Sequence, residues 1–114
     1  MIKNIKLSIV FLLALLVNAK AQKQQYYETE YNNFRRGLEL FDKEKYGAAQ
    51  KVFADLVEKI NDPTNEASVN AEYYLAICGV YLFNRDADFL LRDFIEKHPE
   101  SPRVEDAYYQ LGIF

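Results

Sequence analysis

Side chains able to act as a nucleophile, a base or a metal ligand are scarce in this sequence. It contains one cysteine, Cys78, and one histidine, His98. A metal site needs several donors that converge on one ion, and neither residue has a second donor at ligand spacing. Cys78 lies on an apolar helical face, as a small core residue would. His98 lies beside Pro99 at a predicted helix end, near the last helix carbonyls. We therefore predict no metal and no cofactor.

Acidic residues occur in pairs that could, in principle, supply a general acid and a general base. Asp86 and Asp88 form one pair, and Glu105 and Asp106 form another. Both pairs lie in turns or at predicted helix starts, where acids favour the helix dipole and solubility. The sequence has no glycine-rich phosphate loop and no Gly-x-Ser-x-Gly elbow. We predict that this chain is not an enzyme.

Residues 1–21 have the pattern of a signal peptide. Lys3 and Lys6 precede the apolar run from Leu7 to Val17, and Ala19-Lys20-Ala21 places small residues where a signal peptidase cuts. The alternative is a membrane anchor, but a run of eleven residues, apolar except for Ser8, spans only about half of a roughly 30 Å hydrocarbon layer. We predict export and cleavage before Gln22. No cysteine lies near this point for lipid attachment, so the mature part is not expected to span or be anchored in the membrane.

Charge excludes some partners of the mature part. The chain has 14 basic and 17 acidic residues, and residues 1–21 hold three lysines and no acid, which leaves a net charge of −6 for residues 22–114. An acidic domain without a basic cluster is a poor binder of nucleic acid or of anionic membranes. A single cysteine excludes an internal disulfide. The remaining length suffices for one small domain.

The mature region is predicted to be all helical, because its apolar residues recur every three or four positions. Five helices are expected, joined by short polar turns: Tyr26 to Lys43, Tyr46 to Ile60, Glu66 to Phe83, one after Asp86 that ends near Lys97, and one that starts at Ser101 and Pro102. Gly37, inside the first helix, indicates a closely approaching neighbour. The third helix is apolar around most of its circumference and should pack on two sides.

A repeat of 34 residues relates the third helix to the fifth. Each segment reads aromatic, aliphatic, small: Tyr74, Ile77 and Cys78 in one, and Tyr108, Leu111 and Gly112 in the other. Such periods are typical of stacked helical hairpins. We predict a right-handed solenoid of antiparallel hairpins, about two and a half repeats long. Because the fifth helix has no partner, the chain is expected to be part of a longer protein with further repeats.

The residues of these predicted helices resemble the tetratricopeptide repeat (TPR) family. Gly37, Leu40, Tyr46, Ala49 and Phe53 match, in order, the small, aliphatic and aromatic positions of that repeat. In the second repeat either Cys78 or Ala76 can be the small residue, and the sequence does not decide between them. The resemblance covers about residues 26–114, and it implies that the mature part, residues 22–114, is a TPR domain.

A narrower resemblance covers Phe94 to Pro102 and Ala107 to Gly112. These segments are similar to repeats of the outer-membrane assembly factor BamD and its relatives, including the periplasmic Tol-Pal-associated protein. That likeness implies a scaffold of the bacterial cell envelope that holds proteins without performing chemistry, free in the periplasm or associated with the outer membrane. Two alternatives remain: an accessory TPR domain at the start of a larger exported enzyme, and a spacer without a ligand.

The TPR resemblance also implies a concave groove that binds a protein or peptide. Its groove-facing positions correspond to Tyr31, Phe34, Leu38 and Phe41 in the first repeat, to Glu72, Leu75, Gly79 and Leu82 in the second, and to Asp106, Tyr109 and Ile113 in the third. Such a groove would be aromatic with an acidic rim. It would suit a peptide with apolar anchors and some basic charge.

Overall fold

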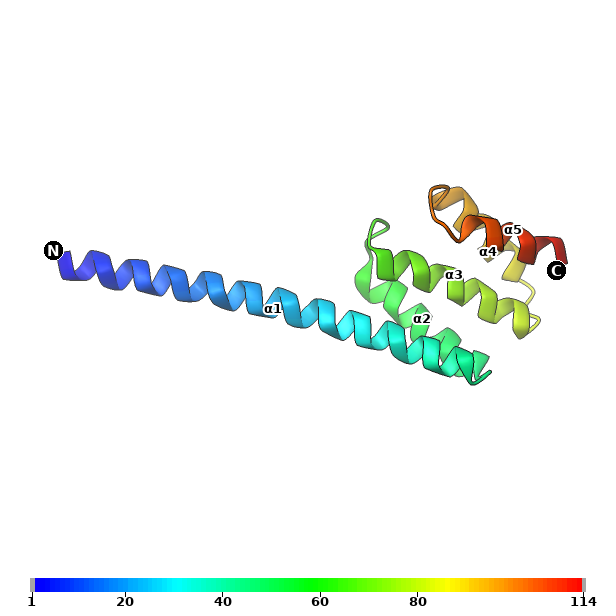
Figure 1. The fold of residues 1–114 in the computed structure, drawn as a ribbon, viewed down its shortest axis with the longest axis horizontal. Coiled ribbons are helices and arrows are strands. Elements are labelled where there is room, and N and C mark those ends of the chain that lie inside the picture. Colours follow the sequence, from blue (N-terminus) through cyan, green and yellow to red (C-terminus); the bar gives the residue numbers. More distant parts are fainter. Residues whose placement is uncertain (1, 114) are drawn as a thin grey trace.

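The computed structural model describes the backbone of residues 2–113 and the side chains of residues 4–113. Within this range it contains five helices and no strand, which confirms the all-α fold class. The helices are α1 (Ile2–Asp42), α2 (Tyr46–Ile60), α3 (Glu66–Tyr81), α4 (Ala87–Lys97) and α5 (Val104–Ile113). Figure 1 shows α1 as a long rod whose C-terminal part packs beside α2 and α3.

The first helix is longer than the predicted Tyr26 to Lys43. It begins at Ile2 and runs without a break through the expected cleavage region, a length of about 62 Å (Figure 1). No glycine or proline interrupts it before Gly37, and residues 19–25 are mostly good helix formers, so nothing ends the helix between the apolar run and Tyr26. Residues 4–29 are all exposed.

By length and composition, the Asn4–Asp42 part of α1 contains one stretch that could cross a membrane. A signal sequence near the N-terminus passes the same test. The structure is therefore compatible with a signal peptide and with an anchor, and the two interpretations of residues 1–21 stay open.

The α1–α2 hairpin is held by a close contact between a glycine and a phenylalanine. Ala49 and Phe53 of α2 are fully buried. A Cβ added to Gly37 would lie 2.6 Å from Cε1 of Phe53, so only glycine allows the two helices to approach this closely. The expectation that Gly37 marks a close neighbour is confirmed.

The third helix packs on two sides, as predicted. On one side, Ala71 and Cys78 join the buried cluster of Ala49, Phe53 and Leu56 from α2. On the other, Tyr73, Ala76 and Ile77 join Leu91 and Phe94 of α4 and Ala107 of α5. Ala76 is therefore the small residue that faces the α4 cluster, whereas Cys78 faces α2.

The start of α3 is fixed by its N-cap. The side-chain oxygen of Asn65 accepts a hydrogen bond from the backbone N–H of Ser68, at 3.1 Å. Before it, Oδ1 of Asp62 accepts bonds from the N–H and the hydroxyl of Thr64, which lower the pKa of Asp62 below its ordinary value. This short polar turn places the first residues of α3 beside α1.

Helix contacts follow chain order. Each helix packs on the next, and the further contacts are between α1 and α3 and between α3 and α5. Within residues 2–113, α2 and α4 do not touch each other. The odd-numbered helices thus share one side of the assembly, and α5, which begins three residues after the predicted Ser101, lies across α3 and α4 (Figure 1).

We predict that Gly37→Ala destabilises the protein, although alanine is the better helix former. The added methyl group would overlap the fully buried ring of Phe53, and overpacking of this kind costs about 1–3 kcal/mol. Gly47→Ala is the matched control, since a Cβ there meets nothing within 4 Å and should stabilise α2 by about 0.5–1 kcal/mol. Urea unfolding followed by circular dichroism measures both changes; equal stabilisation by the two variants would contradict the contact.

Candidate functional site

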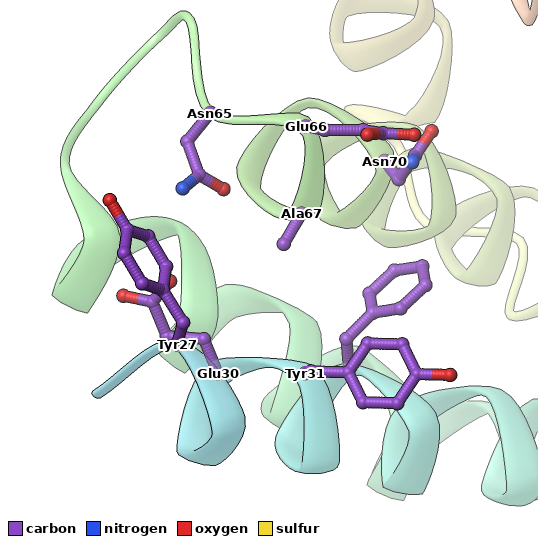
Figure 2. Close-up of a pocket in the computed structure, with 8 residues that line it drawn as sticks. Tyr27, Glu30, Tyr31, Asn65, Glu66, Ala67 and Asn70 are labelled. Carbon is purple, nitrogen blue, oxygen red and sulfur yellow. The ribbon is translucent and has the colours of Figure 1, made fainter. Parts of the chain in front are cut away.

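A pocket of about 320 Å³ lies between α1 and the first turns of α3 (Figure 2). Four of its lining residues come from α1 and four from the start of α3: Tyr27, Glu30, Tyr31, Phe34, Asn65, Glu66, Ala67 and Asn70. Tyr27, Glu30, Tyr31 and Phe34 follow the i, i+3, i+4, i+7 pattern of one helix face. The pocket therefore exists because this face of α1 continues past the end of α2 and meets the capped start of α3.

Glu30 is the unusual residue of this pocket. Its side chain is buried, with 7% of the residue exposed, and its Oε1 has no hydrogen-bond partner. The pKa of the neighbouring Tyr26 is raised above its ordinary value, chiefly by a side-chain hydrogen bond to Glu30 and then by desolvation. A buried carboxylate oxygen without a partner is costly to fold, so Glu30 is the residue of this pocket whose burial calls for an explanation.

The far wall of the pocket is aromatic and is anchored by an arginine. The ring of Phe34 lies 5.8 Å from that of Phe53 and 6.1 Å from that of Tyr74. The guanidinium of Arg103 lies over the Tyr73 and Tyr74 rings, at 5.0 and 4.8 Å, and its Nε donates to Oδ1 of Asn70 at 3.0 Å. Arg103 thus ties the segment before α5 to α3. The sequence offered no local signal for this contact, because 33 positions separate Arg103 from Asn70.

The predicted groove residues occupy two kinds of environment. Phe34, Leu38, Phe41 and Leu75 are half-buried and pack against the clusters between the helices. Tyr31, Leu82 and Tyr109 are exposed, and Glu72 is half-buried. Of this set, the structure brings Tyr31 and Phe34 together in the pocket. Sequence reasoning missed Tyr27, Glu30 and the α3 residues of the pocket. That the predicted groove residues bind a partner remains a prediction for all of them.

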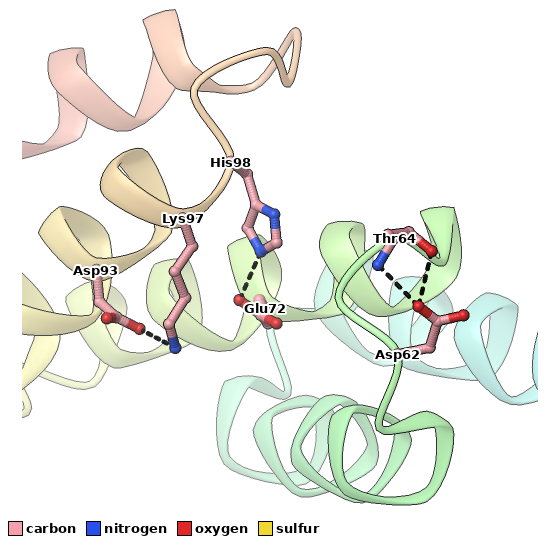
Figure 3. A network of polar contacts seen from close by, with 6 residues as sticks. All are labelled: Asp62, Thr64, Glu72, Asp93, Lys97 and His98. Carbon is pink, nitrogen blue, oxygen red and sulfur yellow. Dashed lines mark hydrogen bonds and ion pairs between the residues drawn. The ribbon is translucent and has the colours of Figure 1, made fainter.

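His98 lies at a helix end, as predicted, but its side chain has a partner that the sequence did not indicate. It is the C-cap residue of α4 and is buried, but its ring points towards α3, where Nε2 lies 2.9 Å from Oε2 of Glu72 (Figure 3). The ring also packs against Phe94, with centroids 5.3 Å apart. An ionised carboxylate only accepts hydrogen bonds, so the imidazole N–H donates. His98 therefore joins α4 to α3, and the nearby Lys97 pairs with Asp93 at 2.7 Å on the surface of α4 (Figure 3).

Among the described residues, no three His, Cys, Asp or Glu side chains are grouped in a way that could hold a metal ion. Cys78 is fully buried, and burial raises the pKa of its thiol from 9.0 to about 11. A thiol with this pKa stays protonated and unreactive near neutral pH. The prediction that the chain is not an enzyme is untested by these observations, and it remains a prediction.

Comparison with known proteins identifies no relative: no family model, no curated protein and no solved structure matches this chain. The function is therefore argued from the site and the fold alone.

We predict that Cys78 resists alkylation in the folded protein. At pH 8, iodoacetamide should label it roughly 100-fold more slowly than in urea, since modification requires opening of the core. The raised pKa adds a pH effect: stability is full below about pH 9 and falls as the pH rises towards 11, because the unfolded thiol ionises first. Cys78→Ala should lack this part of the decline. Rapid labelling of the folded protein would contradict the buried position.

We predict energetic coupling between His98 and Glu72. Either residue changed to alanine should destabilise the protein by about 1–3 kcal/mol, because the remaining partner loses its hydrogen bond in a largely buried setting. In a double-mutant cycle the two losses should be less than additive by at least about 0.5 kcal/mol. Additive losses would show that the contact contributes nothing. The exposed pair Arg35 and Glu39, 3.7 Å apart, is the control and should couple by less.

Proposed function

We propose that residues 22–114 form a non-catalytic TPR scaffold that holds a protein partner in the bacterial cell envelope, during assembly or maintenance of the outer membrane. The observation that carries this proposal is the serial packing of the helices. Contacts run from each helix to the next and between odd-numbered helices, which is the arrangement expected of stacked hairpins. A scaffold of this kind offers one continuous surface to a partner instead of an enclosed catalytic cleft.

Two interhelical contacts support the TPR assignment. Gly37 of α1 faces Phe53 of α2, and Ala76 of α3 shares a buried cluster with Phe94 of α4. In both hairpins a small residue on the first helix thus meets a phenylalanine on the second. The loop between α3 and α4 is longer than that between α1 and α2, five residues against three, which accounts for the shift of the small position from Cys78 to Ala76.

The pocket between α1 and α3 supports the binding role. It joins the first helices of two consecutive hairpins, which is where the groove of a TPR solenoid is expected. Exposed aromatic residues occur on the first helices of the predicted hairpins: Tyr31 on α1 is 63% exposed and Tyr109 on α5 is 65% exposed. Aromatic side chains are frequent anchors in protein interfaces.

The first part of α1 supports export. Its apolar side chains from Leu7 to Val17 contact no other helix and remain exposed, as expected for a leader that acts before the domain folds. Removal of residues 1–21 would leave the packed part of α1 intact, because its buried contacts begin at Glu30.

We predict that a photo-crosslinking amino acid at Tyr31 captures a discrete partner in the intact cell envelope. The same group at Lys51, exposed on α2 and outside the pocket, is the matched control and should capture little. The expected result is one defined adduct at Tyr31, formed with a mature chain that begins at Gln22, as read by mass spectrometry. Identical adduct patterns at both positions, or none at either, would contradict groove binding.

A further inference from the structure

We propose that the pocket between α1 and α3 binds the cationic end of an arginine or lysine side chain of the protein partner, with Glu30 as its counter-charge. This inference rests on the proposed function, since it specifies the chemistry by which the scaffold recognises its partner. Figure 2 shows Glu30 below Tyr27 on α1, on the side of the pocket opposite Asn65 and Glu66.

The first reason is the missing partner of Glu30. Glu30 is more than nine-tenths buried, and its Oε1 has neither solvent contact nor a hydrogen bond. Leaving a buried carboxylate oxygen unpaired is destabilising. Because Oε1 has no solvent contact, the Glu30 carboxyl must rotate towards the pocket before a guanidinium or ammonium can donate to it, and that bond would remove the penalty. An N⁺–H donor forms a charge-assisted hydrogen bond, which is stronger than a neutral one.

The second reason is the charge of the lining. The described residues that line the pocket include two acids, Glu30 and Glu66, and no base. Arg103 contacts the lining, but its Nε is bonded to Asn70 and its guanidinium lies over the Tyr73 and Tyr74 rings. Lys20 and Lys23 line a separate, adjoining pocket that shares Tyr27 and Tyr31. At the start of α3, the Asn65 cap and the Glu66 carboxylate offset the positive end of the helix dipole. The pocket therefore favours a cation over an anion.

The third reason is the shape and chemistry of the walls. Tyr27, Tyr31 and Phe34 line the pocket together with Glu30, and the aliphatic stem of an arginine or lysine can pack against their rings. Aromatic rings also attract cations, and Arg103 over Tyr73 and Tyr74 shows that this chain already uses such contacts. The volume of about 320 Å³ is at the lower end for ligand pockets, which suits one side chain better than a large cofactor.

The test uses the full chain in a non-ionic detergent, with N-acetyl-arginine amide as the probe. Nuclear magnetic resonance should show saturable shifts at Tyr31, Ala67 and Asn70, with a Kd in the millimolar range expected for one side chain. N-acetyl-citrulline amide has nearly the same shape without the charge and should bind at least tenfold more weakly. Equal shifts from the two probes would overturn the proposal.

Variants separate Glu30 from the rest of the acidic surface. Glu30→Gln should weaken the arginine probe at least tenfold, whereas Glu58→Gln, exposed on α2 and outside the pocket, should leave its Kd unchanged. Unchanged binding in Glu30→Gln would overturn the role of Glu30. Spermidine is a further arm: binding tenfold tighter than that of the arginine probe would assign the pocket to a free amine and overturn the side-chain assignment.

Thermal stability is a further readout. Replacing a carboxylate with a purely structural role would lower the Tm, whereas the opposite change is expected for Glu30. Glu30→Gln removes an unpaired buried charge, so its Tm should rise by a few degrees while probe binding is lost. A lowered Tm would indicate that the hydrogen bond with Tyr26 stabilises the Glu30 carboxyl more than the unpaired Oε1 destabilises it, and it would overturn the inference. If the probe fails but Tyr31 still crosslinks one partner, the scaffold function stands without this pocket; if the probe binds but no partner is captured, the proposed function fails instead.

Discussion

The two-sided burial of α3 is the constraint on which the rest of the structure depends. Its face towards α2 carries Ala71 and Cys78, and its face towards α4 carries Tyr73, Ala76 and Ile77. Small residues on both faces allow the neighbouring helices to approach, and the aromatic rings of Phe53, Tyr73, Tyr74 and Phe94 fill the space between them. Because α3 contacts every other helix, it sets where α1 lies and therefore where the pocket forms.

Much of this arrangement could be predicted from the sequence, because it depends on local spacing. Apolar residues every three or four positions identify the helices, and the Gly37 to Phe53 pattern identifies the first hairpin. The sequence could not decide whether Cys78 or Ala76 is the small residue of the second hairpin, because the longer loop between α3 and α4 changes the spacing to Phe94. Only the packing shows that Ala76 lies on the face towards α4. The unbroken start of α1 was also missed, because a cleavage site is a signal for a peptidase and not a helix breaker.

The site was harder to predict than the fold. Glu30 lies in a polar stretch and reads as a solvated residue, and its burial follows from the distant turn that brings Asn65 beside α1. His98 was assigned to helix carbonyls, whereas its partner Glu72 is 26 positions away. Periodicity predicts which face of a helix is buried, but it cannot predict which polar groups the tertiary contacts enclose. The candidate chemistry of this chain therefore came from the structure, at the junction of two consecutive hairpins.

Native-state hydrogen exchange tests the central position of α3 most directly. Amides of residues 71–78 should exchange more slowly than those of α2 and α4, because α3 alone packs against every other helix. Residues 4–29, which are all exposed, should exchange fastest. If α2, α3 and α4 open only when the whole domain unfolds, their amides will all report the global free energy of unfolding. Equal protection of this kind would also fit a cooperative stack. Protection in α3 below that of α2 and α4 would contradict the account, since a helix at the centre of the packing cannot open before its neighbours.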